Sequence, residues 1–545
     1  MSRFPTRSLR ADAGDDHAIA LAVIAIATLA RFAFSAVMDY GVDEAYAVSV
    51  ARTFQWSFFD HPPLAFWTVG LMEWLFGTLA PHWLLRLPFV LAFSVTTYLV
   101  FDLTRRLFDA RSGLWAVVTL STAPFFFASA GTWLVPDGPV DLWLAATAVL
   151  LARILFADLT KSEIAETWLF AGVTFGLAAL SKYHAFLFAA GAVAFIVASR
   201  HRSLLGEKAP WIAGLIAAII ITPLILWNAE NSWISFAFQS GRAGVTKDFQ
   251  PLNVVQSLVG QAVYLWPWTL IGLGVALVSP LIYRPAWLGG AGERERAVFL
   301  ASLALPAVAL FTLAPILGSK GLPHWPMPGW LFAFPLLGRW LADLETRGSR
   351  GPATWLSLSA GLLTAAALAV TVLLRSGAVA AWALATPGLL DGPAYLKPLY
   401  EEAGEWRGLT AALADRGITF KDNQFAVALN WREAARIGTV LGGSVDIAAF
   451  DKDPRGFAFL TDQRALLGRD AVIIGKWRPM MTIEDRFKDY FRMIDRPQLI
   501  TVTLAGGIPR TLGIAVAHDL KAPFPLPYGA TGRDLQMNAV TPPQP

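Results

Sequence analysis

Long apolar runs recur along the first 374 residues of this 545-residue chain. An α-helix needs about 20 mostly apolar residues to cross the hydrocarbon core of a bilayer. Eleven stretches are candidate spans, at 18–37, 84–103, 114–129, 140–156, 168–180, 185–198, 212–227, 254–277, 297–317, 325–341 and 355–374. The pattern predicts a polytopic α-helical membrane protein with about 11 transmembrane helices.

The loops between these stretches alternate in basic content. Short cytoplasmic loops are enriched in Lys and Arg, so an amino terminus in the cytoplasm places one set of cations on that side. This set is Arg105, Arg106, Arg111, Lys161, Arg200, Arg202, Lys208, Arg284, Arg294, Arg296, Arg339, Arg347 and Arg350. For successive loops to alternate between the two sides of the membrane in this way, residues 64–80 must lie along the membrane surface, and residues 168–198 must cross the membrane twice. Loops 38–83, 131–139, 228–253 and 320–324 are then outside.

The composition changes after about residue 377, where charged residues return at an ordinary frequency. Short apolar runs at 425–431, 445–450 and 471–477 predict buried strands, and 400–415 and 432–441 have helical spacing. We expect a transmembrane domain over 1–376, a soluble α/β domain over 377–534 and a disordered tail over 535–545. By parity the α/β domain is extracytoplasmic.

Composition narrows the class of protein further. Hydrophobic residues make up 55% of the chain and charged residues 15%, and there is no cysteine. Disulfides and thiolate metal sites are therefore excluded. The net charge of +4 comes from the loop cations, which argues for membrane topology rather than nucleic-acid binding. No P-loop, dinucleotide fingerprint, His-Glu-x-x-His or EF-hand motif is present.

The first outer loop carries adjacent acids, Asp43 and Glu44, close to the end of the first span. One carboxylate there can act as a general base on a hydroxyl, and the other can hold a metal or orient a cationic acceptor. The alternative is an acidic helix cap at the water line, which we favour about two to one for an isolated pair.

The same loop continues with Asp60 and His61, followed by a rigid Pro62-Pro63. An Asp-His pair can ligate a divalent metal or bind a phosphate, but alone it is a surface turn about as often. In the second outer loop Asp137 is more typical of a plain helix cap. Asp141 lies one turn deeper, where an acid should face the bundle interior or a wet cavity.

Cations accompany these acids on the outer side. Lys182 and His184 lie at a turn between two spans, and Arg31 lies in the outer half of the first span. Arg242, Lys320 and His324 lie in further outer segments. Snorkelling towards headgroups explains single cations equally well. Acids and cations gathered on one side nevertheless favour a functional site.

The motifs resemble those of the GT-C polyprenyl-phosphate-sugar transferases, over residues 17 to about 340. This family includes the lipid A aminoarabinose and galacturonic acid transferases and, more distantly, the protein O-mannosyltransferases. The resemblance rests on Asp43-Glu44-Ala-Tyr46, Asp60-His61-Pro62-Pro63-Leu64, Phe76-Gly77, Arg86-Leu-Pro88, Pro136-Asp137-Gly-Pro139, Gly176 to Tyr183, and Lys320 to Pro326.

The resemblance implies a multi-pass enzyme of the inner or plasma membrane that takes its sugar from a polyprenyl phosphate at the outer leaflet. The acceptor would be lipid A, a glycan or a protein, and the sugar configuration would invert. Asp43 would be the catalytic base, with Asp137 also in the catalytic set, and Asp60 would hold a divalent metal. Donor-binding residues would be Glu44, His61, Lys182, Arg242, Lys320 and His324. His61 stands where the aminoarabinose transferases have a Lys.

Two other classes of protein remain open at this stage. A transporter or flippase for a lipid-linked sugar would use the same groove, but it needs no base beside its ligand and often shows two matching broken spans. A structural membrane protein that recruits partners through its soluble tail would leave Asp141 and the polar outer loops unexplained.

Overall fold

The computed structural model describes residues 8–242, 249–318, 321–375, 405–504 and 507–528. The chain divides into two compact units. The first unit comprises Met1–Phe34, Arg86–Leu226 and Arg242–Ala367, and the second comprises Ser35–Leu85, Trp227–Gly241 and Leu368–Pro545. The carboxyl-terminal α/β region is therefore grouped with two segments that the sequence assigns to outer loops.

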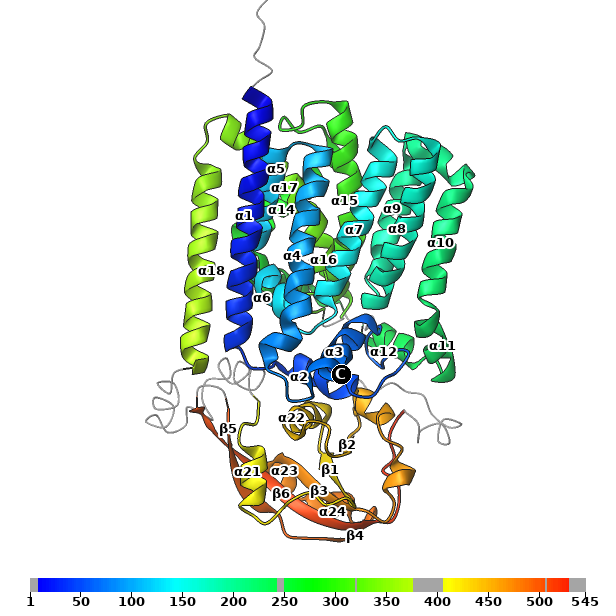
Figure 1. The fold of residues 1–545 in the computed structure, drawn as a ribbon, viewed down its shortest axis with the longest axis vertical. Helices are drawn as coiled ribbons and strands as arrows, with labels where there is room; N and C mark the ends of the chain where they lie inside the picture. The colour runs from blue at the N-terminus through cyan, green and yellow to red at the C-terminus, as the bar shows by residue number, and fades with distance from the viewer. Residues whose placement is uncertain (1–7, 243–248, 319–320, 376–404, 505–506, 529–545) are drawn as a thin grey trace, which may run out of the picture. The chain divides into compact units, whose positions relative to one another are not determined.

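The first unit is a bundle of helices (Figure 1). Its helices, some of which end in the second unit, are α1 (Ser8–Val37), α4 (His82–Leu107), α5 (Ala110–Ser121), α6 (Pro124–Thr132), α7 (Asp137–Phe156), α8 (Lys161–Ser181), α9 (Ala185–Ala198), α10 (Lys208–Ile220), α11 (Thr222–Glu230), α13 (Pro251–Leu265), α14 (Pro267–Ile282), α15 (Ala291–Leu313), α16 (Met327–Trp330), α17 (Phe334–Thr346) and α18 (Gly351–Arg375), with 3₁₀ turns η1 (Arg200–Gly206), η2 (Ala314–Leu317) and η3 (Leu331–Ala333).

Within the described residues, six helices are long and apolar enough to cross a membrane, or up to ten if each bent pair is one span. The sequence predicted eleven. Stretch 114–129 is bent by 77° between α5 and α6, and stretch 254–277 by 105° between α13 and α14. The second bend falls at Trp266, whose φ of +66° precedes Pro267. Proline cannot continue the hydrogen-bond ladder, so a helix bends or restarts there.

Small residues bring neighbouring helices of the bundle together. A Cβ on Gly172 of α8 would lie 2.4 Å from the carbonyl oxygen of Ala213 in α10. A Cβ on Gly338 of α17 would lie 2.4 Å from the carbonyl oxygen of Ser112 in α5. Packing of this kind is what holds helices together in lipid, where no water is released when they associate.

The second unit combines short helices with a sheet. The helices are α2 (Val42–Ala51), α3 (Leu64–Phe76), α12 (Ile234–Arg242), α21 (Leu409–Ala414), α22 (Trp431–Leu441), α23 (Trp477–Met480) and α24 (Ile483–Phe487), with 3₁₀ turns η4 (Arg455–Phe459) and η5 (Gln463–Leu466). The strands are β1 (Gln424–Ala428), β2 (Ile447–Ala449), β3 (Asp470–Lys476), β4 (Phe491–Ile494), β5 (Gln498–Thr503) and β6 (Pro509–Leu520).

The strand order is β2-β1-β3-β6-β4, with β5 also paired to β6. The pairs of β1 with β2 and β3 are parallel, while all pairs of β6 are antiparallel. The three predicted strands and the helix 432–441 are confirmed as β1, β2, β3 and α22. Of the predicted helix 400–415, residues 400–404 lie outside the described residues, and the rest forms only α21. Strands β4, β5 and β6 were not predicted.

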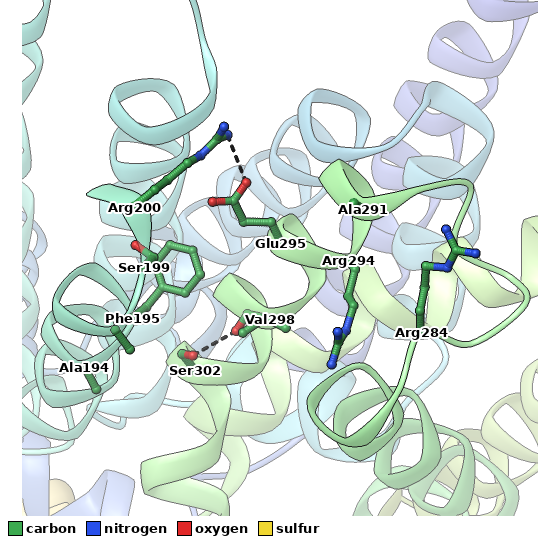
Figure 2. Close-up of a pocket in the computed structure, with 11 residues that line it drawn as sticks. Ala194, Phe195, Ser199, Arg200, Arg284, Ala291, Arg294, Glu295, Val298 and Ser302 are labelled. Carbon is green, nitrogen blue, oxygen red and sulfur yellow. Dashed lines mark hydrogen bonds and ion pairs between the residues drawn. The ribbon is translucent and has the colours of Figure 1, made fainter. Parts of the chain in front are cut away.

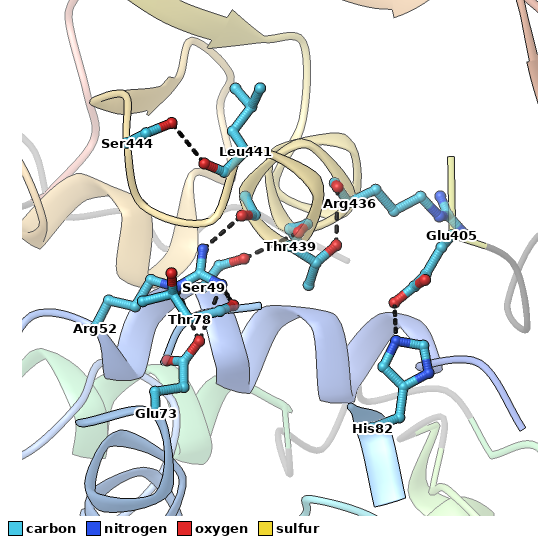
Figure 3. Close-up of polar contacts among 12 residues, drawn as sticks. Ser49, Arg52, Glu73, Thr78, His82, Glu405, Arg436, Thr439, Leu441 and Ser444 are labelled. Carbon is cyan, nitrogen blue, oxygen red and sulfur yellow. Dashed lines mark hydrogen bonds and ion pairs between the residues drawn. The ribbon is translucent and has the colours of Figure 1, made fainter. Parts of the chain in front are cut away.

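Helix α2 of the first outer loop packs on α22 of the α/β region, within the second unit (Figure 3). The Ser49 hydroxyl donates to the carbonyl of Ala435 at 2.9 Å, and Arg52 donates to the carbonyl of Gly438 at 2.5 Å. Arg52 also pairs with Glu73 of α3 at 2.9 Å. A Cβ on Gly438 would lie 2.3 Å from the Ser49 hydroxyl, so a larger residue there would force Ser49 to move.

Candidate active site

The two adjacent acids of α2 differ in their surroundings. Glu44 is 1% exposed, and its carboxylate accepts a hydrogen bond from the backbone N–H of Gly41 at 3.0 Å. Asp43 is exposed to solvent one residue earlier, in the first turn of the helix. The predicted cap is therefore made by Glu44, because its side chain satisfies an amide at the helix start. Asp43 is therefore the member of the pair that is open to solvent.

Asp60 is 2% exposed and lies among groups from the α/β region. Its Oδ1 accepts a hydrogen bond from the Tyr46 hydroxyl at 3.1 Å, and its Oδ2 lies 3.6 Å from Nη1 of Arg455. The Tyr46 oxygen in turn accepts the backbone N–H of Gly456 at 2.9 Å. Burial, together with the charge of Asp60, raises the pKa of Tyr46 well above its usual value, so this hydroxyl remains a donor.

Arg455 is held from several directions. Its guanidinium lies 3.8 Å from the centroid of the Trp431 ring, and its backbone N–H donates to the Tyr528 hydroxyl at 2.9 Å. Its φ is +47°, a left-handed conformation that non-glycine residues adopt only where surrounding contacts hold them. The ring of Phe59, next to Asp60, stacks on Tyr528 with centroids 4.3 Å apart. These contacts fix the Asp60 loop within the second unit.

A metal-capable group lies elsewhere in the second unit. Ligand atoms of Asp39, His82 and Glu405 all lie within 4.8 Å of one another, and this is the one such group among the described residues. His82 Nε2 is 3.0 Å from Glu405 Oε1, as Figure 3 shows. The His82 ring packs on Tyr40 with centroids 4.1 Å apart. An imidazole with two carboxylates suits a divalent ion such as zinc, although Arg407 already pairs with Asp39.

In the first unit, Asp137 and Lys182 form a buried ion pair. Asp137 is 6% exposed and Lys182 4% exposed, and Nζ of Lys182 donates to Oδ1 of Asp137 at 2.8 Å. Asp141, one turn further along α7, is fully buried, and its carboxylate has no hydrogen-bond partner within the part of the chain that the structure describes. The structure thus brings together two predicted site residues that are 45 positions apart.

The remaining predicted residues are more scattered. His61 is half-buried, with its ring centroid 6.5 Å from that of Phe66. His324 is half-buried in the first unit, and its ring centroid lies 6.5 Å from that of Trp325. Arg242 is the last residue of α12, and its side chain is outside the described set, as is the whole of Lys320. Arg31 is fully buried, with its guanidinium 4.8 Å from the centroid of Phe93.

The predicted residues therefore fall into two sets, each described within its own unit. Asp43, Glu44, Asp60 and His61 belong to the second unit, and Asp137 and Lys182 to the first. No role was predicted for Tyr46, for Arg455 or for the group of Asp39, His82 and Glu405. Nothing local could have indicated Arg455, because a single arginine in a soluble segment has no distinctive pattern.

Comparisons with known proteins agree with this picture. Residues 60–227 match the family model described as dolichyl-phosphate-mannose-protein mannosyltransferase. A comparison with curated proteins gave no match. ArnT from Cupriavidus metallidurans in the apo state is 14% identical, with a TM-score of 0.60 over 90% of this chain and 97% of that chain. ArnT bound to undecaprenyl phosphate is 15% identical, with a TM-score of 0.58 over the same shares.

The ArnT-like fold accounts for the helical bundle together with the carboxyl-terminal α/β region. The family model covers the segment from Asp60 to Trp227, which includes Asp137 and Lys182. The apolar helices make the chain a membrane protein. The family model and the fold together confirm the resemblance to the GT-C glycosyltransferases that the sequence motifs indicated.

Proposed function

We propose that this chain is an inverting glycosyltransferase that moves a sugar from a polyprenyl phosphate to a hydroxyl of lipid A, a glycan or a protein. It would act at the outer face of the inner or plasma membrane, with the α/β region outside the cytoplasm. The observation that carries the proposal is the exposure of Asp43, since Asp39, Glu44 and Asp60 of the same loop are all buried. The match to the mannosyltransferase family model supports the reaction class.

The proposed reaction is a single displacement at the anomeric carbon. Asp43 takes the proton of the acceptor hydroxyl, and the hydroxyl oxygen forms a bond to that carbon. The bond from the anomeric carbon to the phosphate oxygen breaks, and its electron pair leaves with the polyprenyl phosphate. Attack from the face opposite the leaving group inverts the configuration.

The leaving phosphate needs positive charge nearby. Cations held in place before the reaction stabilise charge that develops in the transition state. We assign this role to Lys182, His61, His324, Arg242 and Lys320. Lys182 already has Asp137 as its partner at 2.8 Å, so a bound phosphate would either share the Lys182 ammonium with that carboxylate or displace it. Asp137 is thus proposed to set the position of Lys182 rather than to touch the sugar.

The resemblance also implies a divalent metal, for which the sequence suggested Asp60. The carboxylate of Asp60 already faces Tyr46 and the Arg455 guanidinium, and that positive charge opposes a second cation. Asp39, His82 and Glu405 offer an imidazole and two carboxylates within 4.8 Å of one another, and they would hold it, the ion then competing with Arg407 for Asp39. A bound ion would supply further positive charge. Transfer measured with and without a chelator tests this part of the proposal.

The first experiment identifies the substrates. Mass spectrometry of envelope lipids and glycans from cells with and without the protein would reveal the transferred sugar and its acceptor. Transfer is then measured with Asp43→Asn, which keeps the size of the side chain but removes the base. We expect at least a 100-fold loss, the lower end of what a general base contributes. Asp158→Asn, an exposed acid after α7, is the matched control.

Two results would contradict the proposal. Full transfer by Asp43→Asn would remove Asp43 as the base. Movement of a lipid-linked sugar across the membrane, with no new glycosidic bond in any product, would instead favour the transporter. A reporter fusion that places the α/β region in the cytoplasm would contradict the outer-face assignment.

A further inference from the structure

A cavity of about 780 Å³ lies between α9 and α15 in the first unit, and none of the residues proposed for catalysis or donor binding lines it (Figure 2). Its volume is within the range of small-molecule sites, roughly 300–1,000 Å³. The lining comes from the carboxyl end of α9, the amino end of α15 and the segment before α15. These are the ends of two apolar helices, where a headgroup region would begin.

The mouth of the cavity is strongly basic. Arg200, Arg284 and Arg294 line it together with a single acid, Glu295. Arg200 pairs with Glu295 at 2.9 Å, and Nε of Arg294 donates to the carbonyl of Pro280 at 3.0 Å. Three guanidiniums against one carboxylate leave the lining with a net charge of +2. Arginine binds phosphate oxygens with two parallel hydrogen bonds, so this mouth is complementary to a phosphate group.

The deeper wall of the cavity is mostly apolar. Ala194, Phe195 and Val298 lie one to two turns further from the helix ends than the arginines. Ser302 also lines the cavity, and its hydroxyl donates a hydrogen bond to the carbonyl of Val298 at 2.8 Å. Just beyond it the two helices touch, because a Cβ on Gly191 would lie 1.9 Å from the carbonyl oxygen of Ser302. The cavity is thus basic at its mouth and apolar at its base.

We propose that this cavity binds the headgroup of an anionic phospholipid, with the phosphate at the arginines and the start of an acyl chain along α9 and α15. Basic pockets between transmembrane helices bind anionic headgroups. The rule that cytoplasmic loops are basic accounts for arginines at this end of the bundle. It does not account for three arginines lining one cavity whose remaining wall is mostly apolar, a combination that matches the charge and the apolar part of a lipid. The site is independent of the proposed catalytic activity.

The test uses the purified full chain and native mass spectrometry. Phosphatidylglycerol and phosphatidylcholine with identical acyl chains are offered together in equal amounts. The wild-type protein should retain phosphatidylglycerol in preference. The double variant Arg200→Ala/Arg284→Ala should bind it about 25-fold more weakly, at roughly fivefold for each cation near an anionic headgroup. Binding of phosphatidylcholine should not change.

Two controls distinguish lipid binding in the cavity from an effect of the protein's net charge and from binding of phosphate alone. Arg202→Ala/Arg350→Ala removes the same charge from two exposed arginines outside the lining, and should leave lipid retention unchanged. Equal loss in both double variants would overturn the proposal, as would undiminished retention in Arg200→Ala/Arg284→Ala. Inorganic phosphate is offered alone in a further sample. Phosphate that bound as tightly as phosphatidylglycerol would also overturn the lipid assignment, because the apolar base would then contribute nothing.

Discussion

The buried pair of Asp137 and Lys182 allows a quantitative prediction. At 2.8 Å, two unit charges attract by about 6 kcal/mol at an effective dielectric of 20. Most of this offsets the cost of removing both charges from water, so the pair as a whole adds little stability. Removing one partner leaves the other charge buried and unpaired, which costs about 3–5 kcal/mol. Asp137→Ala and Lys182→Met should therefore each be strongly destabilising.

The double variant should be far less destabilised than the sum of the single variants. We expect a coupling energy of at least about 2 kcal/mol, because neither Asp137 nor Lys182 is then left buried without the other. The assay is unfolding in mixed detergent micelles, followed by far-ultraviolet circular dichroism. Asp158→Ala with Lys161→Met, both at exposed positions, is the matched cycle and should show less than about 1 kcal/mol. Additive effects at Asp137 and Lys182 would refute the buried pair.

Two further predictions concern the second unit. Arg455→Ala removes the cation that faces the buried Asp60 and should lower the free energy of unfolding by about 3 kcal/mol in the same assay. Arg455→Lys should recover only part of this loss. A loss below about 0.5 kcal/mol in Arg455→Ala would contradict the contact. Burial raises the pKa of Glu73 to about 6, although Arg52 opposes the shift. The folded state then binds the proton more tightly than the unfolded state, so stability should fall as pH rises from about 4.5 to 6. Thermal unfolding of Glu73→Gln should lose this dependence, and an unchanged pH profile would exclude Glu73 as its source.

The apolar pattern predicted most of the bundle because lipid imposes a strict length on each spanning helix. It could not predict the bends, since the break at Trp266 depends on a positive φ as well as on Pro267. In the α/β region, β1, β2 and β3 were found because each is an almost continuous buried run. Strand β5 alternates between exposed and buried residues, and it pairs along the edge of the long β6, so its apolar content is lower.

The candidate site was predictable only in its residue types. Asp137 and Lys182 were each chosen for lying at the end of a span, but their ion pair depends on how α7 packs on α8. The link between Asp60 and Arg455 joins residues almost 400 positions apart, and no local pattern encodes it. Glu44 was predicted to bind the donor, and its carboxylate accepts the Gly41 N–H, the contact expected of the helix cap that the sequence offered as the alternative.

The contacts of the second unit suggest why the first outer loop and the α/β region belong together. Of the acids in that loop, Glu44 is held by a backbone amide and Asp60 by Tyr46 and Arg455, so Asp43 alone of the three remains exposed. Helix α2, which carries Asp43, rests on α22 through Ser49. A base that must meet its substrate in a fixed geometry needs a rigid support. The α/β region supplies that support, so under the proposed mechanism a change that loosens the contact of α22 with Ser49 should lower the rate of transfer.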